Sequence, residues 1–178
     1  MNNFKTISKF LSLILRHQPE TVGIELDEAG WVDVQVLITA VNKAGKKLDE
    51  DLLREVVESN DKQRFAYSSD GLRIRANQGH SVQVDLQLKI QTPPEILYHG
   101  TATRFVASIK EQGLIKRSRQ HVHLSADKST ATKVGRRHGK VIILTVRARA
   151  MVEHGHKFYL SENKVWLTDE VPAEFINF

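Results

Sequence analysis

The 178-residue chain lacks cysteine, and this excludes a disulfide framework, a thiolate nucleophile and a thiolate metal site. It has no apolar run near the roughly 20 residues that a membrane-spanning helix needs. The N-terminal MNNFKTISKF shows none of the order of a secretory signal. No P-loop or catalytic Ser-His-Asp pattern is present. These absences predict a cytoplasmic protein with no membrane partner.

Excess positive charge is missing from the first half of the chain and present in the second. Residues 1–94 hold 12 Lys and Arg against 13 Asp and Glu, whereas residues 95–178 hold 14 against 8, and the whole chain carries +5. A basic half favours an anionic partner, either nucleic acid or a phosphate-bearing ligand. Mild basicity is also common in proteins without such a partner, so charge alone leaves both interpretations open.

The first half predicts three helices followed by a β-hairpin. Apolar residues recur at helical spacing over residues 4–15. Asp33 and Asp49 are suited to cap the N-termini of two further helices, and Gly45 is suited to end the first of these. In residues 64–76, apolar residues alternate with other residues on both sides of a Ser-Ser-Asp-Gly turn, and this pattern is typical of a hairpin. This order predicts a winged-helix lobe.

Proline is rare, and two of the four prolines stand together in QTPPE, residues 91–95. Successive prolines stiffen an extended chain, so we expect a linker there, after a weakly alternating extended stretch over 79–91. The boundary divides the chain into domains at 1–92 and 93–178. The sequence of the second domain predicts short strands and two helices, and we therefore expect the whole chain to be α+β. The strands are expected at 95–101, 121–125, 140–146 and 157–168, and the helices at 103–112 and 127–135.

Four segments combine residues that suit binding or catalysis. Arg16 and His17 end an apolar helix, where cations interact favourably with the helix dipole but also suit an anion. Residues 98–101, Tyr-His-Gly-Thr, lie between a strand and a helix, where glycine lets a ligand approach the backbone and helix N–H groups favour an anion. A plain structural turn is the alternative. In residues 134–139, VGRRHG, the cations could equally form an exposed basic helix end.

The fourth segment, HVHLS at 121–125, places His121, His123 and Ser125 on one face of a strand. Such a face is typical of a cavity lining, and a His-x-His pair can also chelate a metal. A second pair occurs in HGH, residues 154–156. His-x-His pairs also arise by chance in a chain with eight histidines, and we expect no metal.

Together these segments resemble the RNA 2′-phosphotransferase family, the tRNA-splicing 2′-phosphotransferases and their bacterial counterparts. The resemblance covers nearly the whole chain. It runs through LSLILRH (11–17), GW (30–31), DKQRFAYSSDG (61–71), QGH (78–80), LYHGT (97–101), HVHLS (121–125), VGRRHG (134–139) and VWLT (165–168). It implies a winged-helix N-terminal lobe followed by an ADP-ribosyltransferase-like lobe of mixed α/β structure.

The resemblance also implies the reaction. The family removes an internal 2′-phosphate from RNA with NAD⁺ as co-substrate. The phosphate attacks the anomeric carbon of the nicotinamide riboside and releases nicotinamide. The ribose 2″-hydroxyl of this 2′-phospho-ADP-ribosylated RNA then attacks phosphorus, which yields RNA with a 2′-hydroxyl and ADP-ribose 1″,2″-cyclic phosphate. The implied partners are RNA bearing an internal 2′-phosphate and NAD⁺, and we expect a monomer that needs no metal.

The implied site residues fall into two sets. The catalytic set maps onto Arg16, His17, Arg64 and Arg137, with the arginines binding phosphate and His17 exchanging a proton in the second step. The NAD⁺ set maps onto Tyr98, His99, Gly100, Thr101, Arg119, His123, Leu124 and Ser125.

The chain departs from many other ADP-ribosyltransferases, which carry a catalytic glutamate on a late strand. The matching region, NKVWLTDE (163–170), presents Val165 and Trp166 instead. An anionic phosphate nucleophile needs no carboxylate base, and a carboxylate would repel it. Two alternatives remain open: a winged-helix nucleic-acid-binding regulator that senses NAD or ADP-ribose, and an enzyme that ADP-ribosylates proteins or nucleic-acid ends. The acidic stretch DEDLLREVVES (49–59) speaks against a DNA-recognition helix.

Overall fold

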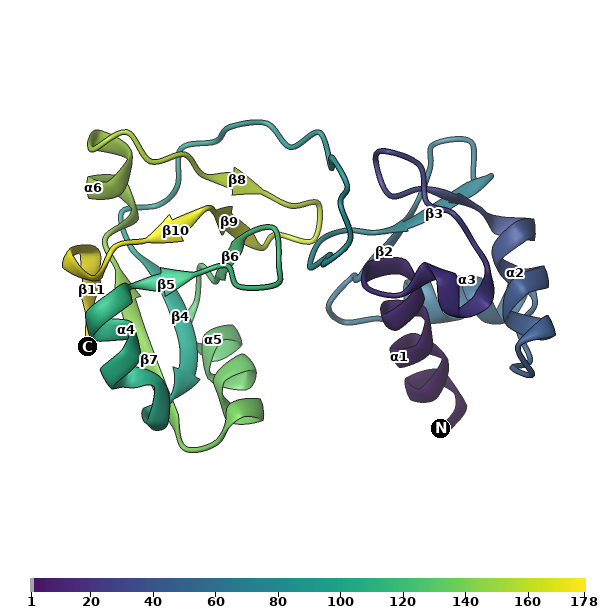
Figure 1. Cartoon of the computed structure of the whole chain (residues 1–178), viewed down its shortest axis with the longest axis horizontal. Coiled ribbons are helices and arrows are strands. Elements are labelled where there is room, and N and C mark those ends of the chain that lie inside the picture. Colours follow the sequence, from purple (N-terminus) through teal and green to yellow (C-terminus); the bar gives the residue numbers. More distant parts are fainter. Residues whose placement is uncertain (1) are drawn as a thin grey trace. The chain divides into compact units, whose positions relative to one another are not determined.

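The structure is a computed structural model that describes residues 2–178. The chain forms two compact units, one that ends at Gln87 and one that spans Leu88–Phe178 (Figure 1). Both contain helices and small antiparallel sheets, which confirms the α+β class. The segment around the two prolines is held by the second unit: Nη2 of Arg149 donates to the carbonyl of Pro93 over 3.0 Å. Ile90 forms a bridge with Tyr159 in the same unit.

The first unit consists of three α-helices and a three-stranded antiparallel sheet in the order β1-β3-β2. The predicted helices and hairpin are confirmed. Its elements are α1 (Asn2–Arg16), η1 (Pro19–Val22), β1 (Val32–Asp33), α2 (Val34–Lys43), α3 (Glu50–Glu58), β2 (Phe65–Tyr67) and β3 (Arg73–Ala76). The stretch over 79–91 forms no strand, although Val84 and Leu86 are buried.

Local sequence signals set the ends of these helices. The carboxylate of Asp33 accepts the amides of Gln35 and Val36, and that of Asp49 accepts the amide of Leu52. Both caps satisfy N–H groups that would otherwise have no partner within the helix. Gly45, with φ of 84°, follows α2 in the left-handed conformation that commonly ends a helix.

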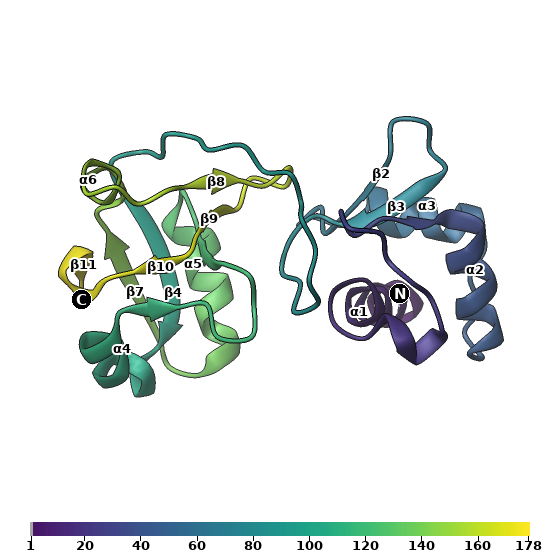
Figure 2. The ribbon, with the colours of Figure 1, turned by 45° about the horizontal axis from the view of Figure 1, so that its top comes forward.

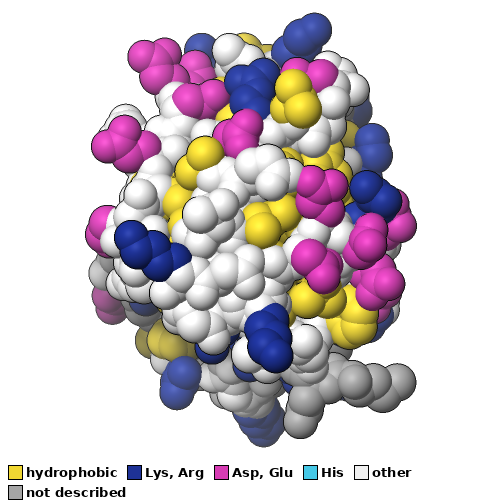
Figure 3. Space-filling view, turned by 90° about the vertical axis from the view of Figure 1, so that its right-hand side faces the viewer, with side chains coloured by type: hydrophobic (Ala, Val, Ile, Leu, Met, Phe, Trp, Pro, Cys, Tyr) yellow, Lys and Arg dark blue, Asp and Glu magenta, His cyan; other side chains and the backbone are white. Residues whose placement is uncertain are grey.

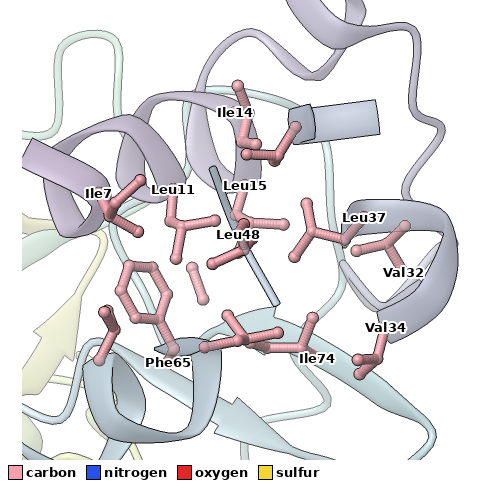
Figure 4. Close-up of a cluster of buried hydrophobic side chains, with 14 of the residues drawn as sticks. Ile7, Leu11, Ile14, Leu15, Val32, Val34, Leu37, Leu48, Phe65 and Ile74 are labelled. Carbon is pink, nitrogen blue, oxygen red and sulfur yellow. The ribbon is translucent and has the colours of Figure 1, made fainter. Parts of the chain in front are cut away.

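The core of the first unit fixes the position of the end of α1. Ile7, Leu11, Ile14 and Leu15 lie on one face of α1 and are at most 2% exposed. Figure 4 shows these side chains directed toward the sheet side of the core, where Phe65 and Ile74 lie. Full burial of one such side chain contributes roughly 1.5–3 kcal/mol. Arg16 and His17 are therefore presented by a helix that the core holds firmly.

The second unit contains three small sheets with short helices between them. The three sheets have the orders β11-β7-β4, β6-β9-β8 and β10-β5, and all pairs are antiparallel. Its elements are β4 (Leu97–Ala102), η2 (Thr103–Phe105), α4 (Val106–Gln112), β5 (Leu114–Ile115), β6 (Val122–Leu124), α5 (Lys128–Gly135), η3 (Arg136–His138), β7 (Val141–Val146), α6 (Ala148–Glu153), β8 (Tyr159–Leu160), β9 (Trp166–Thr168), β10 (Glu170–Val171), η4 (Ala173–Phe175) and β11 (Ile176–Asn177).

Helix α5 packs directly onto strand β4, and Figures 1 and 2 show the two running side by side. A Cβ at Gly100 would lie 1.6 Å from the backbone oxygen of Ala131. A Cβ at Gly135 would lie 3.0 Å from the backbone of Gly100 and Thr101. The space at Gly100 is thus used for the approach of a helix, and the sequence interpretation of an approaching ligand does not apply on this side of the strand.

Candidate functional site

The C-terminal end of α1 lies against the loop that follows β3. The amides of Ser81 and Val82 donate to the carbonyl of Arg16, over 2.9 and 3.3 Å. Nδ1 of His17 lies 2.9 Å from the hydroxyl of Ser81, a hydrogen bond that fixes the imidazole plane. A Cβ at Gly79 would lie 3.6 Å from Cζ of Arg16, so a side chain at this position would contact the guanidinium.

A second histidine, His80, lies in the loop that follows β3 and is 1% exposed. Neither of its ring nitrogens has a hydrogen-bond partner among the described residues. Burial is the main cause that lowers the pKa of His80 to about 4, and the charges of Arg16, Arg75 and His17 contribute to the same shift. His80 is therefore a neutral imidazole at neutral pH, placed among fixed cations. Arg75 is itself only 8% exposed.

Arg64 reaches the same loop through the hairpin. Its carbonyl accepts the amide of Asn77 over 2.9 Å, and its Nη1 donates to Oδ1 of Asn60 over 3.4 Å. The Asn77 side chain donates to the carbonyl of Gln63 over 2.6 Å, so Asn77 holds the start of β2 twice. The structure thus places the predicted residues Arg16 and His17 against residues 79–82, whereas Arg64 meets this loop through its backbone carbonyl and its guanidinium bonds to Asn60.

This arrangement suits an anion. Guanidinium groups stay charged at any working pH and hold phosphate oxygens with two parallel hydrogen bonds. The oriented imidazole of His17 adds a group that can exchange a proton. A favourable interaction with the helix dipole explains a cation in the last turn of α1, but it does not explain the further arginine that is buried nearby.

In the second unit, one backbone bridge brings the two histidine-bearing motifs together. The amide of Tyr98 donates to the carbonyl of Ser125, and the amide of Ser125 donates to the carbonyl of Tyr98, both over 2.8 Å. The segments 98–101 and 121–125 therefore lie on neighbouring strands. Val122 and Leu124 are buried, while His121, His123 and Ser125 are partly exposed, as the alternation predicts.

The hydrogen bonds define the roles of the ring nitrogens. Nδ1 of His99 lies 3.0 Å from the carbonyl of His123, and because a carbonyl only accepts, Nδ1 carries the proton. Burial lowers the pKa of His99; the hydrogen bond opposes this effect, and the charges of His138 and Arg119 add to it. His99 is thus neutral, with Nε2 as an acceptor. Arg119 donates from Nη1 to Nδ1 of His123 over 3.3 Å, which makes that nitrogen an acceptor.

The remaining predicted residues differ in what they can offer a ligand. Thr101 and Leu124 are buried, and the Leu124 side chain packs in the core of this unit. The ring of Tyr98 is partly exposed, with Nζ of Lys128 5.6 Å from its centroid. Arg137 is exposed in η3.

Comparison with known proteins identifies the family. A sequence profile described as "RNA 2′-phosphotransferase, Tpt1 / KptA family" matches residues 2–170. The chain belongs to this family. It is 60% identical over 177 residues to the probable RNA 2′-phosphotransferase of Flavobacterium johnsoniae, which covers 99% of this chain and 97% of the relative. It is 58% identical over 172 residues to the protein of the same name from Rhodopirellula baltica, covering 96% and 94%.

For this RNA 2′-phosphotransferase family member, sequence reasoning missed several residues around the C-terminal end of α1. Arg75, Gly79, His80 and Ser81 were assigned no role, although the QGH motif contributed to the resemblance. The hairpin alternation places Arg75 on the outer face and so predicts exposure, whereas it is 8% exposed and packs against the Trp31 ring and the carbonyl of Ala29, which are distant in sequence. No sequence signal gives that coverage.

The described part of the chain holds neither a candidate metal site nor a candidate membrane-spanning helix. Nowhere in residues 2–178 do three or more His, Asp or Glu side chains converge into a group that could hold a metal ion. None of the helices described is both long and apolar enough to cross a bilayer.

Proposed function

We propose that this protein is an NAD⁺-dependent transferase that removes an internal 2′-phosphate from RNA. Its relatives are named RNA 2′-phosphotransferases. One observation carries the proposal: α1 ends in Arg16 and an oriented His17 against a loop that contains a neutral, buried His80. Fixed cations beside a proton-exchanging ring suit the transfer of a phosphate.

In this proposal the first unit is a winged-helix lobe and the second an ADP-ribosyltransferase-like lobe. Three helices and a hairpin in the first unit support the former assignment. Small antiparallel sheets with helices between them support the latter. The acidic helix α3, with Glu50, Asp51, Glu55 and Glu58 against a single Arg54, makes a DNA-binding role of the first unit unfavourable. Figure 3 shows a face of this unit on which Asp and Glu side chains lie among the Lys and Arg, without a continuous basic patch on the described atoms.

In this proposal, the predicted catalytic residues of the first unit bind phosphate and transfer a proton. Arg16 and Arg64 hold and orient the 2′-phosphate of the RNA, whose charge they neutralise. His17 accepts the proton of the attacking ribose hydroxyl in the second step and returns it to the departing RNA 2′-oxygen. The hydrogen bond with Ser81 keeps the imidazole of His17 in the orientation that this proton transfer needs.

The second unit offers a donor and acceptor set that fits NAD⁺. Nε2 of His99 can accept from a ribose hydroxyl, Arg119 can bind a pyrophosphate oxygen, and the ring of Tyr98 offers an apolar face. When bound, NAD⁺ supplies an anomeric carbon with nicotinamide as its leaving group. His123 orients Arg119 through their hydrogen bond.

The sequence resemblance assigns the third phosphate-binding arginine to Arg137. Arg119 suits the NAD⁺ site, because it is hydrogen-bonded to His123 and its charge acts on His99. Arg137 lies beside His138, whose charge also acts on His99, and in this proposal it binds the phosphate.

The test uses an RNA with one internal 2′-phosphate, NAD⁺ and an excess of chelator. We expect RNA with a free 2′-hydroxyl, nicotinamide and ADP-ribose 1″,2″-cyclic phosphate in equal amounts. Omission of NAD⁺ should abolish all three products. Phosphate release without NAD⁺, or a requirement for a divalent ion, would contradict the proposal. ADP-ribose found only on protein or on RNA ends would assign the chain to ADP-ribosylation instead.

A further inference from the structure

The register of the first sheet sorts its side chains onto two faces. Val32 pairs with Ile74 and Phe65 pairs with Ala76, and all four are buried in the core. Because successive side chains of a strand point to opposite faces, the alternate residues lie on the outer face. These are Trp31 on the approach to β1, Arg73 and Arg75 on β3, and Arg64 next to β2.

Trp31 is held rigidly on this face. Oδ1 of Asp27 accepts the amides of Ala29 and Trp31, over 2.9 and 2.8 Å, and the Asp27 amide donates to the carbonyl of Trp31 over 2.9 Å. Cζ of Arg75 lies 4.4 Å from the centroid of the indole ring, and Nη1 of Arg75 donates to the carbonyl of Ala29 over 3.4 Å. The indole is thus positioned before any ligand arrives, yet it remains partly exposed.

Arg73 extends this surface toward solvent. Its guanidinium carbon lies 5.7 Å from the centroid of the Trp31 ring, and Nη1 forms an ion pair with Asp27 at 3.5 Å. Both partners of this pair are about half exposed, so the pair costs little to open. An aromatic ring flanked by arginines is the combination that binds single-stranded nucleic acid, because the ring stacks on a base and arginine binds the backbone phosphate.

Arg75 connects this surface to Arg16 and His80, near the C-terminal end of α1. One side of its guanidinium faces Trp31, and its charge acts on His80, which the charge of Arg16 also affects. We propose that Trp31 and Arg73 form an RNA-binding subsite, in which the indole stacks on the base next to the 2′-phosphorylated nucleotide and Arg73 binds the adjoining backbone phosphate. This inference rests on the proposed function for its choice of RNA as the ligand.

The test measures binding and so does not depend on turnover. The chain has two tryptophans, and W166F leaves Trp31 as the sole tryptophan, whose fluorescence can be excited selectively. An RNA oligonucleotide of about six residues with one internal 2′-phosphate should quench this fluorescence, whereas a 2′-phosphorylated mononucleotide should bind without quenching. The wild-type protein and the variants W31L, W31F, R73Q and R54Q are then compared by fluorescence anisotropy of the labelled oligonucleotide. Arg54 is the matched control, since it is an exposed arginine of the same unit that pairs with Asp51.

Loss of the stacking ring in W31L should weaken oligonucleotide binding on the order of tenfold, while W31F should retain most of it. R73Q should reduce the slope of log K against log salt by about 0.7, the value for one phosphate contact with a single strand. R54Q should change neither quantity. Unchanged binding in W31L, or an equal loss in R54Q and R73Q, would overturn the subsite. If W31L does not fold, the quenching of Trp31 and the salt slope of R73Q decide. Oligonucleotide binding with no phosphate removal would refute the proposed function and leave the subsite standing.

Discussion

Acidification should destabilise the first unit through one residue, His80. Its pKa falls from the ordinary 6.5 to about 4 because the ring is buried beside Arg16 and Arg75. Between these two pH values the unfolded chain binds a proton that the folded chain does not bind. The free energy of unfolding therefore decreases as the pH falls from about 6.5 to about 4. At 1.36 kcal/mol per pKa unit, the total loss is roughly 3 kcal/mol, a large share of the stability of a small domain.

Urea denaturation at several pH values between 7 and 4.5 measures this loss. Fluorescence of Trp31 in W166F protein reports the first unit, because Trp166 belongs to the second. The matched variant adds H80Q, which replaces the ring with a side chain that does not titrate. H80Q alters the stability at pH 7 through packing, so the comparison concerns only the pH dependence. We expect the decline of the unfolding free energy to be about 1.4 kcal/mol per pH unit shallower in H80Q near pH 5. Parallel curves for the two proteins would show that the reasoning about His80 is wrong.

Three further predictions concern the reaction and the fold. In single-turnover reactions His17→Ala should accumulate the ADP-ribosylated RNA intermediate on a gel, whereas Arg64→Ala should slow its formation by about 10- to 100-fold, from the loss of a charge-assisted hydrogen bond; the reverse pattern would exchange their roles. Arg119→Ala should raise the KM for NAD⁺ more than Arg137→Ala does, because Arg119 is hydrogen-bonded to His123 and the resemblance assigns Arg137 to the RNA phosphate; a larger effect at Arg137 would contradict the assignment of Arg119 to the NAD⁺ site. Gly100→Ala should lower the thermal unfolding temperature strongly or prevent folding, since its Cβ would overlap the backbone of α5; a melting curve like that of the wild type would contradict the packing described.

The elements that sequence predicted well are those with local causes. Asp33 and Asp49 cap their helices through amides two or three residues away, and such signals are written in a short stretch of chain. The two-residue strands β5 and β10 were not predicted. Leu114 and Val171 pair across more than fifty residues, and two residues are too few to show an alternating pattern.

The candidate site likewise contains residues that the sequence reveals and residues that only the fold reveals. Arg16 and His17 stand out because a charged pair ends an apolar helix. Nothing in the sequence indicates that Arg75 and His80 are buried, because their burial depends on loops that meet only in the fold. The use of Gly100 likewise required knowing that α5 returns onto β4.

The backbone contact between α5 and β4 also determines how the second unit can move. At Gly100 the three nearest neighbours of an added Cβ are all backbone atoms, of Ala131 and Gly135, so helix and strand meet there without a deformable layer of side chains to absorb a displacement of one against the other. Strand and helix must shift as one body, and His99 on the strand moves with η3, which directly follows the helix. Any adjustment of this unit around a ligand is therefore left to other segments, such as the loop over 116–121 that carries Arg119.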